Sequence, residues 1–284
     1  CRVDGSFKEE FERFRAFAKF ANQNRRLFKG KIDEDIVLVI PHSQIFSARN
    51  LVTEATKRAV RALHYDLKHA CRAVSEYRLE ALLAEERAPL FLIMPAPRSI
   101  SDAGWANLLK LVEKGSTLII TGYFEADEHF RPAERVGKMF GFSGSRPVNR
   151  RESGAVFSGE KLQRIERADA DDEVREYIHG KGKIVWHPVP LENGDSTEPI
   201  AEFYKSILPE LLNEYLPTGD VLDDILIRVT RFETVLLFTI INESGTDREV
   251  MVRGSSHISV VVSAGRANLV FVDKRTGNVL SRVY

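Results

Sequence analysis

The side chains best placed to bind a ligand in this sequence come directly after three short apolar runs. They are His42, Gln44, Arg98, Tyr123 and Phe124. In an open sheet of parallel strands, ligands bind outside the carboxyl ends of the strands, and these residues would stand at that edge. Aromatic and hydrogen-bonding side chains suit a sugar or the surface of a partner protein. The alternative is that these residues only pack within their own loops.

A nucleophile for hydrolysis is not indicated. An α/β hydrolase carries its serine in a G-x-S-x-G turn between a strand and a helix. The most similar string, Gly-Phe-Ser-Gly at 141–144, has its second glycine one position early. The third apolar run ends in Thr121 and Gly122, with neither cysteine nor serine at that point. Cys71 lies in a helix-like run, so a Cys–His nucleophilic pair is not indicated either.

Patterns for binding metals, phosphates and cofactors are also missing. The seven histidines form no H-x-x-x-H or H-E-x-x-H pair, and two cysteines are too few for a structural zinc site. The acidic string at 169–173 lacks the central glycine and the distal glutamate of an EF-hand loop. Neither G-x-G-x-x-G nor G-x-x-x-x-G-K-S/T occurs. We therefore expect no metal and no cofactor.

The composition argues against two classes of partner. The 284 residues carry 41 Lys and Arg against 41 Asp and Glu, a formal charge of zero. Nucleic-acid binding requires a basic surface that displaces counterions. No apolar run approaches the roughly 20 residues of a membrane span. We therefore expect neither nucleic acid nor a membrane as a partner.

Apolar runs that alternate with helical patterns predict a doubly wound parallel sheet. Continuous apolar runs are typical of strands buried on both faces. The predicted strands are 35–40, 72–76, 89–95, 116–122 and 182–187, and the predicted helices are about 50–68, 99–113 and 199–216. Ser101 is a candidate N-cap, and Pro209 should kink the last helix or divide it into two. The irregular segment 125–172 is expected to be an insertion with a short helix and some antiparallel strand.

After residue 216 the chain consists of short β-branched runs separated by turn residues. The runs are 222–229, 234–241, 249–253, 257–262, 269–273 and 279–284. Regular short strands of this kind predict a small all-β sandwich. The expected organisation is an N-terminal linker helix over 1–30, an α/β domain over 31–216 and a β domain over 217–284.

The first segment carries an apolar stripe at helical spacing. The stripe consists of Phe7, Phe11, Phe14, Ala18 and Ala21, with Phe17 and Phe20 beside it and charged residues of both signs on the opposite face. Such a stripe must pack on something. We expect it to pack against the rest of this chain or against a neighbour that is missing from it. Mixed charge signs argue against a helix lying on a membrane surface.

Three regions together resemble a known family. They are the segment 7–28, the first predicted strand with its loop, and the stretches 88–94, 99–113 and 115–120. These look like the β-galactosidase trimerisation domain, a degenerate fold of the flavodoxin-like, class I glutamine-amidotransferase type. In that family the domain follows a catalytic (β/α)₈ barrel and precedes a small β domain. The segment 222–284 fits the latter.

The resemblance implies a non-catalytic accessory and oligomerisation region of a glycoside hydrolase. Both catalytic carboxylates of the family lie on the barrel, so no catalytic residue carries over to this chain. The implied partners are further copies of the chain, for which the family name suggests a trimer, and an upstream barrel of the same polypeptide. Carbohydrate is a further candidate ligand. Cys1 in place of Met fits a piece of a longer protein.

Two other functions stay open from the sequence. One is a stand-alone flavodoxin-like hydrolase or amidotransferase relative with an atypical site near His42 and Tyr123. The other is a carbohydrate-binding module whose affinity lies in the β domain, where Phe232, Phe271 and Tyr284 are the candidate aromatic residues.

Overall fold

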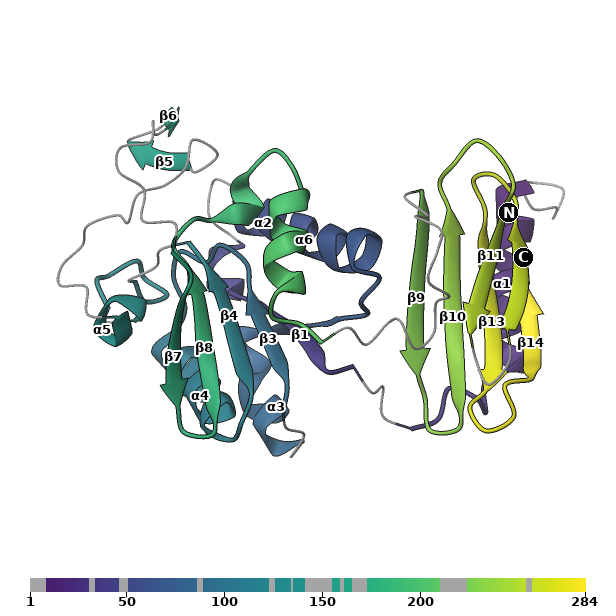
Figure 1. The fold of residues 1–284 in the computed structure, drawn as a ribbon, viewed down its shortest axis with the longest axis horizontal. Coiled ribbons are helices and arrows are strands. Elements are labelled where there is room, and N and C mark those ends of the chain that lie inside the picture. The colour runs from purple at the N-terminus through teal and green to yellow at the C-terminus, as the bar shows by residue number, and fades with distance from the viewer. Residues whose placement is uncertain are drawn as a thin grey trace, which may run out of the picture. The chain divides into compact units, whose positions relative to one another are not determined.

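The chain forms two compact units, an α/β unit and a β unit (Figure 1). The computed structural model describes residues 9–30, 34–45, 51–85, 89–122, 126–133, 135–140, 155–158, 161–164, 173–209, 224–253 and 257–284. Contacts between Cα atoms assign 35–67 and 71–209 to the α/β unit, and assign 1–34, 68–70 and 210–284 to the β unit. None of the helices within the described residues is long and apolar enough to cross a membrane.

A six-stranded sheet in the order β2-β1-β3-β4-β8-β7 forms the centre of the α/β unit. Its strands are β1 (Ile36–Ile40), β2 (Arg72–Ser75), β3 (Phe91–Met94), β4 (Thr117–Thr121), β7 (Arg175–His179) and β8 (Gly182–His187). All neighbouring strands are parallel except β7, which pairs antiparallel with β8. The predicted parallel sheet is thus confirmed. The edge strand β7 was not predicted, because its exposed and mostly polar residues have no apolar run.

Helices cover both faces of this sheet. They are α2 (Leu51–Arg61, continued by a π-helical turn at Ala62–Asp66), α3 (Leu79–Ala84), α4 (Asp102–Glu113), α5 (Val136–Phe140) and α6 (Glu198–Lys205). In β1, Val37 and Val39 pack in one core cluster with residues of α3 and α4. Ile36 and Leu38 pack in a second cluster with residues of α2 and α6. Each strand residue is therefore buried on one face or the other, as its apolar run predicts.

The ends of two helices test the sequence predictions. Ser101 is the N-cap of α4, and its Oγ accepts a hydrogen bond from Gly104 N at 3.1 Å, as predicted. The last helix was predicted to be kinked or divided into two by Pro209. α6 ends at Lys205, since a proline at 209 has no N–H to bond the carbonyl of residue 205. Residues 210–216 lie outside the described part.

The β unit contains antiparallel sheets. Its strands are β9 (Ile225–Arg231), β10 (Val235–Asn242), β11 (Arg248–Arg253), β12 (His257–Val262), β13 (Ala267–Asp273) and β14 (Val279–Val283). A four-stranded sheet has the order β14-β13-β10-β9, and β11 pairs with β12. One apolar cluster joins residues of β9, β10 and β13 to residues of β11 and β12. The predicted small all-β domain is confirmed. In the α/β unit, β5 (Ala155–Ser158) pairs antiparallel with β6 (Lys161–Arg164).

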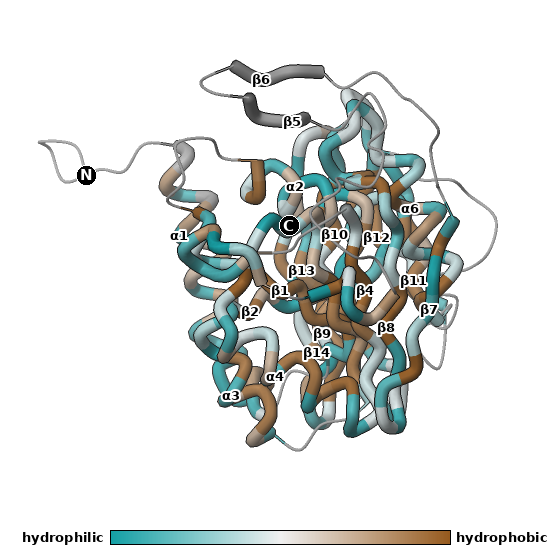
Figure 2. The backbone as a smooth tube through the Cα atoms, turned by 90° about the vertical axis from the view of Figure 1, so that its left-hand side faces the viewer, coloured by the Kyte–Doolittle hydropathy of each residue, from teal (hydrophilic) through white to brown (hydrophobic). Residues whose placement is uncertain are grey.

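Helix α1 (Glu9–Gln23) packs on the other face of the four-stranded sheet. Figure 1 draws it beside β13 and β14, and Figure 2 shows hydrophobic and hydrophilic stretches alternating along it. Phe20 stacks on Phe271 with ring centroids 5.6 Å apart. The predicted stripe does not make this contact, since Phe11, Phe14, Ala18 and Ala21 are exposed.

Candidate functional site

The strand order creates a switch point between β1 and β3. The chain passes from β1 to β2 on one side and returns to β3 on the other. In sheets of this order the loops diverge there and leave a crevice in which ligands bind. His42 and Gln44 lie in the loop after β1, and Arg98 lies in the loop after β3. The structure brings these three predicted residues to one edge, whereas Tyr123 and Phe124 lie outside the described residues.

Gln44 fills the space between the two loops. Its side chain is only 2% exposed. Its Oε1 accepts a hydrogen bond from Arg98 N at 3.1 Å, and its Nε2 donates to the carbonyl oxygen of Ser99. Both ends of the amide are therefore bound to the opposite loop. A residue predicted to face a ligand instead closes the crevice from within.

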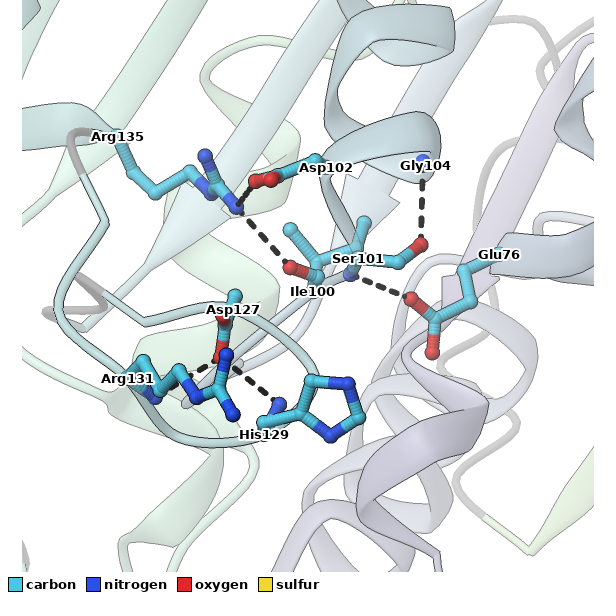
Figure 3. Close-up of polar contacts among 9 residues, drawn as sticks. All are labelled: Glu76, Ile100, Ser101, Asp102, Gly104, Asp127, His129, Arg131 and Arg135. Atoms are coloured by element: carbon cyan, nitrogen blue, oxygen red, sulfur yellow. Dashed lines mark hydrogen bonds and ion pairs between the residues drawn. The ribbon is translucent and has the colours of Figure 1, made fainter.

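Glu76 joins a third loop to the same structure. It is buried at the carboxyl end of β2, where one carboxylate oxygen accepts from Ser43 N at 2.7 Å. The other oxygen accepts from Ser101 N at 2.8 Å, next to the first turn of α4 (Figure 3). A carboxylate at the start of a helix is favoured by the helix dipole. Glu76 was not among the predicted site residues, although it is the last residue of the predicted strand 72–76 and therefore lies at the edge of the sheet.

Glu192 is the centre of a second buried network at the ends of β3 and β4. It accepts hydrogen bonds from the hydroxyls of Thr121 and Tyr204. Thr121 Oγ1 in turn accepts from Ala96 N at 2.8 Å. Burial raises the pKa of the Glu192 carboxyl above its ordinary value. These polar groups satisfy one another and face the interior, so they hold the strand ends together.

The position after β4 has no room for a nucleophile. Gly122 occupies it with φ of +75°. A Cβ at Gly122 would lie 2.9 Å from the Cβ of Pro190, closer than carbon atoms approach in proteins. The indole of Trp186 donates to Gly122 O at 2.7 Å and fixes this turn. A serine or cysteine would therefore have to displace the loop that follows β8.

Outside the closed crevice, two aromatic rings face solvent. Tyr77 is 60% exposed, and its ring meets the His42 ring edge-on with centroids 5.7 Å apart. Phe130 is 46% exposed, and the guanidinium carbon of Arg98 lies 5.6 Å from its ring centroid. Exposed rings beside a cation can contact another protein or a sugar. His42 and Arg98 therefore contribute to a surface and not to a cavity.

The turn that presents Phe130 is held in a strained conformation. Phe130 has φ of +59°, which is rare for a residue with a bulky side chain. Asp127 Oδ1 accepts hydrogen bonds from His129 N and Arg131 N, both at 2.8 Å (Figure 3). Strained residues of this kind concentrate at functional surfaces. No motif or periodicity in the sequence predicted this turn.

A Cys–His contact occurs in the α/β unit, but not at a strand end where a nucleophile was sought. Cys71 Sγ lies 3.5 Å from His64 Nε2. Cys71 directly precedes β2 and is therefore at the amino end of that strand, away from the candidate edge. It is buried in the core cluster beneath α2 and α6. This position gives the thiol a packing role.

One pocket of about 450 Å³ lies between α4, α5 and β7 in the α/β unit. It is lined by Trp105, Leu109, Arg135, Lys138, Met139, Tyr177 and His179. Arg135 is already bound to Asp102 at 2.5 Å and to the carbonyl of Ile100 at 3.2 Å (Figure 3).

Across the described residues, no three His, Cys, Asp or Glu side chains gather in a way that could hold a metal ion.

Comparison with known proteins finds the same fold in much longer enzymes. No protein-family model and no curated protein sequence matches this chain. Among solved structures, Gan42B, a GH42 β-galactosidase from G. stearothermophilus, is similar with a TM-score of 0.56 and 13% identity, over 84% of this chain and 40% of that one. The β-galactosidase from Bacillus circulans sp. alkalophilus has a TM-score of 0.56 and 13% identity, over 91% and 45%.

A third similar structure comes from an archaeon. The β-galactosidase of Halorubrum lacusprofundi has a TM-score of 0.51 and 14% identity, over 94% of this chain and 43% of that one. The chain thus spans less than half the length of each of these three proteins. At such identities the likeness shows a shared fold, an α/β unit followed by a β unit.

Proposed function

We propose that this chain is a non-catalytic accessory region of a glycoside hydrolase of the β-galactosidase type, and that its role is to assemble subunits. In this proposal a catalytic barrel precedes it in the same polypeptide. Copies of the chain associate, and the exposed surface of Tyr77, Phe130 and Arg98 faces a partner subunit or its carbohydrate. No cofactor and no metal takes part.

The observation that carries this proposal is the closure of the switch point by Gln44. A flavodoxin-like enzyme would keep this crevice open for its ligand. Here the amide binds both Arg98 N and Ser99 O, so a ligand would have to break two buried hydrogen bonds to enter. Gly122 adds a second argument, because its contact with Pro190 leaves no space for a nucleophilic side chain.

The fold comparisons support the glycoside-hydrolase part of the proposal. Three similar structures are β-galactosidases, and in each the matched part is under half of the enzyme. The remaining part of each enzyme is long enough to contain a catalytic barrel, which needs about 250 residues or more.

The proposal is tested with the purified chain. We expect it to hydrolyse neither an aryl β-D-galactoside nor an aryl ester, and to release no ammonia from glutamine. We also expect its sedimentation coefficient to rise with concentration, because copies associate. Turnover of any of these substrates above the buffer rate would contradict the non-catalytic role, and a strictly monomeric chain would contradict the assembly role.

The alternative is a stand-alone hydrolase or amidotransferase relative with an atypical site near His42 and Tyr123. The observation in its favour is that His42 is half-exposed at the correct edge of the sheet, beside Tyr77. Turnover that is lost in His42→Ala but retained in His129→Ala, an exposed histidine of a neighbouring loop, would favour this alternative.

A further inference from the structure

We propose that the pocket between α4, α5 and β7 binds an acidic sugar, a hexuronate, through its carboxylate and its ring. We call it the α5 pocket, after the short helix that contributes to it. The side chains that line the pocket indicate an anion with an apolar ring face. That this ring is a sugar rests on the proposed function, an accessory region of a glycoside hydrolase.

Three elements of the α/β unit supply the walls of the α5 pocket. Trp105 and Leu109 are four residues apart and therefore lie on one side of α4. Tyr177 and His179 are two residues apart and therefore lie on one face of β7. The volume of about 450 Å³ is within the range of small-molecule sites. A cavity of this size accommodates a single sugar ring.

The polar side chains of the lining are mainly hydrogen-bond donors. They are Arg135, Lys138, Tyr177 and His179, and the described residues that line the pocket include no Asp, Glu, Asn or Gln. Lys and Arg donate hydrogen bonds but accept none. The hydroxyls of a neutral sugar also donate and therefore need acceptors. A carboxylate only accepts, and charged donors bind it about twice as strongly as neutral ones, so the lining favours an anion.

The two cations of the lining have different roles. Arg135 is 6% exposed, and its Nη2 donates to the carbonyl oxygen of Ile100 at 3.2 Å and to the carboxylate of Asp102 at 2.5 Å (Figure 3). It is therefore a fixed part of the wall, and Asp102 balances its charge. Lys138 is exposed on α5, and its ammonium group can rotate toward a ligand on a flexible four-carbon chain. We expect Lys138 to meet the carboxylate.

The aromatic side chains distinguish a ring-shaped anion from an inorganic one. The rings of Tyr177 and His179 are inclined by only 25°, with centroids 6.4 Å apart. Phe140 supports Tyr177 from the side, with ring centroids 6.2 Å apart. The C–H face of a sugar ring gains free energy when it covers such apolar surface, whereas phosphate or sulfate has no apolar surface to bury.

The two tryptophans of the chain give a site-specific measurement. In the full chain labelled with nitrogen-15, each indole N–H produces one NMR signal. Trp105 lines the pocket, whereas Trp186 is fully buried and its indole donates to Gly122 O at 2.7 Å. Addition of ligand should therefore shift the Trp105 signal and leave the Trp186 signal nearly in place. Trp105→Phe assigns the signals, because one of them disappears.

The probes separate the carboxylate from the ring. D-Galacturonate differs from D-galactose only at C6, where it carries a carboxylate in place of a CH₂OH group. We expect a dissociation constant of about 1 mM for galacturonate, as is usual for a ligand with so few atoms. Galactose should bind at least about tenfold more weakly, because it lacks the charge. Acetate, which lacks the ring, should bind more weakly than galacturonate by a similar factor.

Two variants test the assigned roles, and a third is the control. Lys138→Gln keeps the length of the side chain and should weaken galacturonate binding at least about fivefold, with no effect on galactose. Tyr177→Leu should weaken galacturonate at least about threefold, with no effect on acetate. Lys57→Gln is the matched control, because Lys57 is 66% exposed on α2, which packs on the other face of the sheet. A circular dichroism melt checks that each variant is folded.

The outcomes separate this inference from the proposed function. A Trp105 signal that does not move in about 30 mM galacturonate, far above the expected constant, overturns the inference. It leaves the proposed function intact, because turnover and sedimentation test that function. Equal affinity for galactose, or equal losses in Lys138→Gln and Lys57→Gln, would also overturn it. Benzoate that binds as tightly as galacturonate would overturn the assignment to a sugar.

Discussion

The side-chain oxygen of Gln44 accepts a hydrogen bond from the backbone N of Arg98 at 3.1 Å, across the crevice between the loops after β1 and β3. In related folds this crevice is where a ligand enters. Here a single buried amide ties the two loops together. This bridge is the feature on which the proposed non-catalytic role rests.

Replacing Gln44 should therefore destabilise the α/β unit. Gln44→Leu keeps the volume but leaves Arg98 N and Ser99 O without their bonds, at a cost of about 2–4 kcal/mol for two buried groups. Urea unfolding followed by tryptophan fluorescence measures the loss. Gln23→Leu on the exposed side of α1 is the control and should change stability by less than about 0.5 kcal/mol. Equal effects from both variants would contradict the bridging role.

Glu76 should be sensitive even to its amide analogue. Its two oxygens each accept from a backbone N–H, of Ser43 and of Ser101. Glu76→Gln turns one acceptor into a donor that faces another donor, so about 1–3 kcal/mol should be lost. Glu80→Gln, on the exposed side of α3, is the matched control in the same unfolding assay. If Glu76→Gln is as stable as the wild type, the carboxylate does not hold these loops.

Stability should fall with rising pH through the titration of Glu192. Burial raises the pKa of this carboxyl in the folded state, whereas the unfolded chain retains the ordinary value. Between the two values the folded state binds more protons, so the stabilisation present at acid pH is lost as the pH rises through the folded-state pKa. Glu192→Gln should remove this part of the pH dependence, as measured by urea unfolding from pH 4 to 8. An unchanged pH profile would show that Glu192 does not titrate in this way.

The strained turn at Phe130 gives a comparison between two small residues. Phe130→Ala and Phe130→Gly both remove the ring beside Arg98, but only glycine adopts a φ of +59° without strain. The glycine variant should therefore be more stable by about 1 kcal/mol. Thermal melts of the two variants decide this. A more stable alanine variant would show that the turn relaxes when the ring is removed.

Much of the fold could be predicted because local patterns determine it. The run Ile36–Ile40 is apolar at every position, and this alone marks a strand covered on both faces. The strand β7 escaped prediction because Ile178 and its neighbours are exposed at an edge. In α1 the apolar stripe was predicted, but periodicity did not show that Phe20, and not the stripe, would contact the sheet.

The candidate site was only partly predictable. His42, Gln44 and Arg98 were predicted from their positions after two apolar runs, and they do lie at one edge of the sheet, in the loops after β1 and β3. The role of Gln44 was not visible, because its partners come from a loop that is far along the chain. Glu192 was missed for the same reason, since it lies in a turn and its hydroxyl partner Thr121, on β4, is 71 residues away in the sequence. Periodicity reports which face a residue occupies but not which distant residue it meets.

The most direct test of the account is the rate at which the purified chain hydrolyses an aryl β-D-galactoside, compared with its His42→Ala variant. Closure of the switch point by Gln44 predicts that both proteins match the buffer rate at every pH tested. Hydrolysis by the wild type that disappears in His42→Ala would contradict the account and would show that the edge of this sheet is an active site.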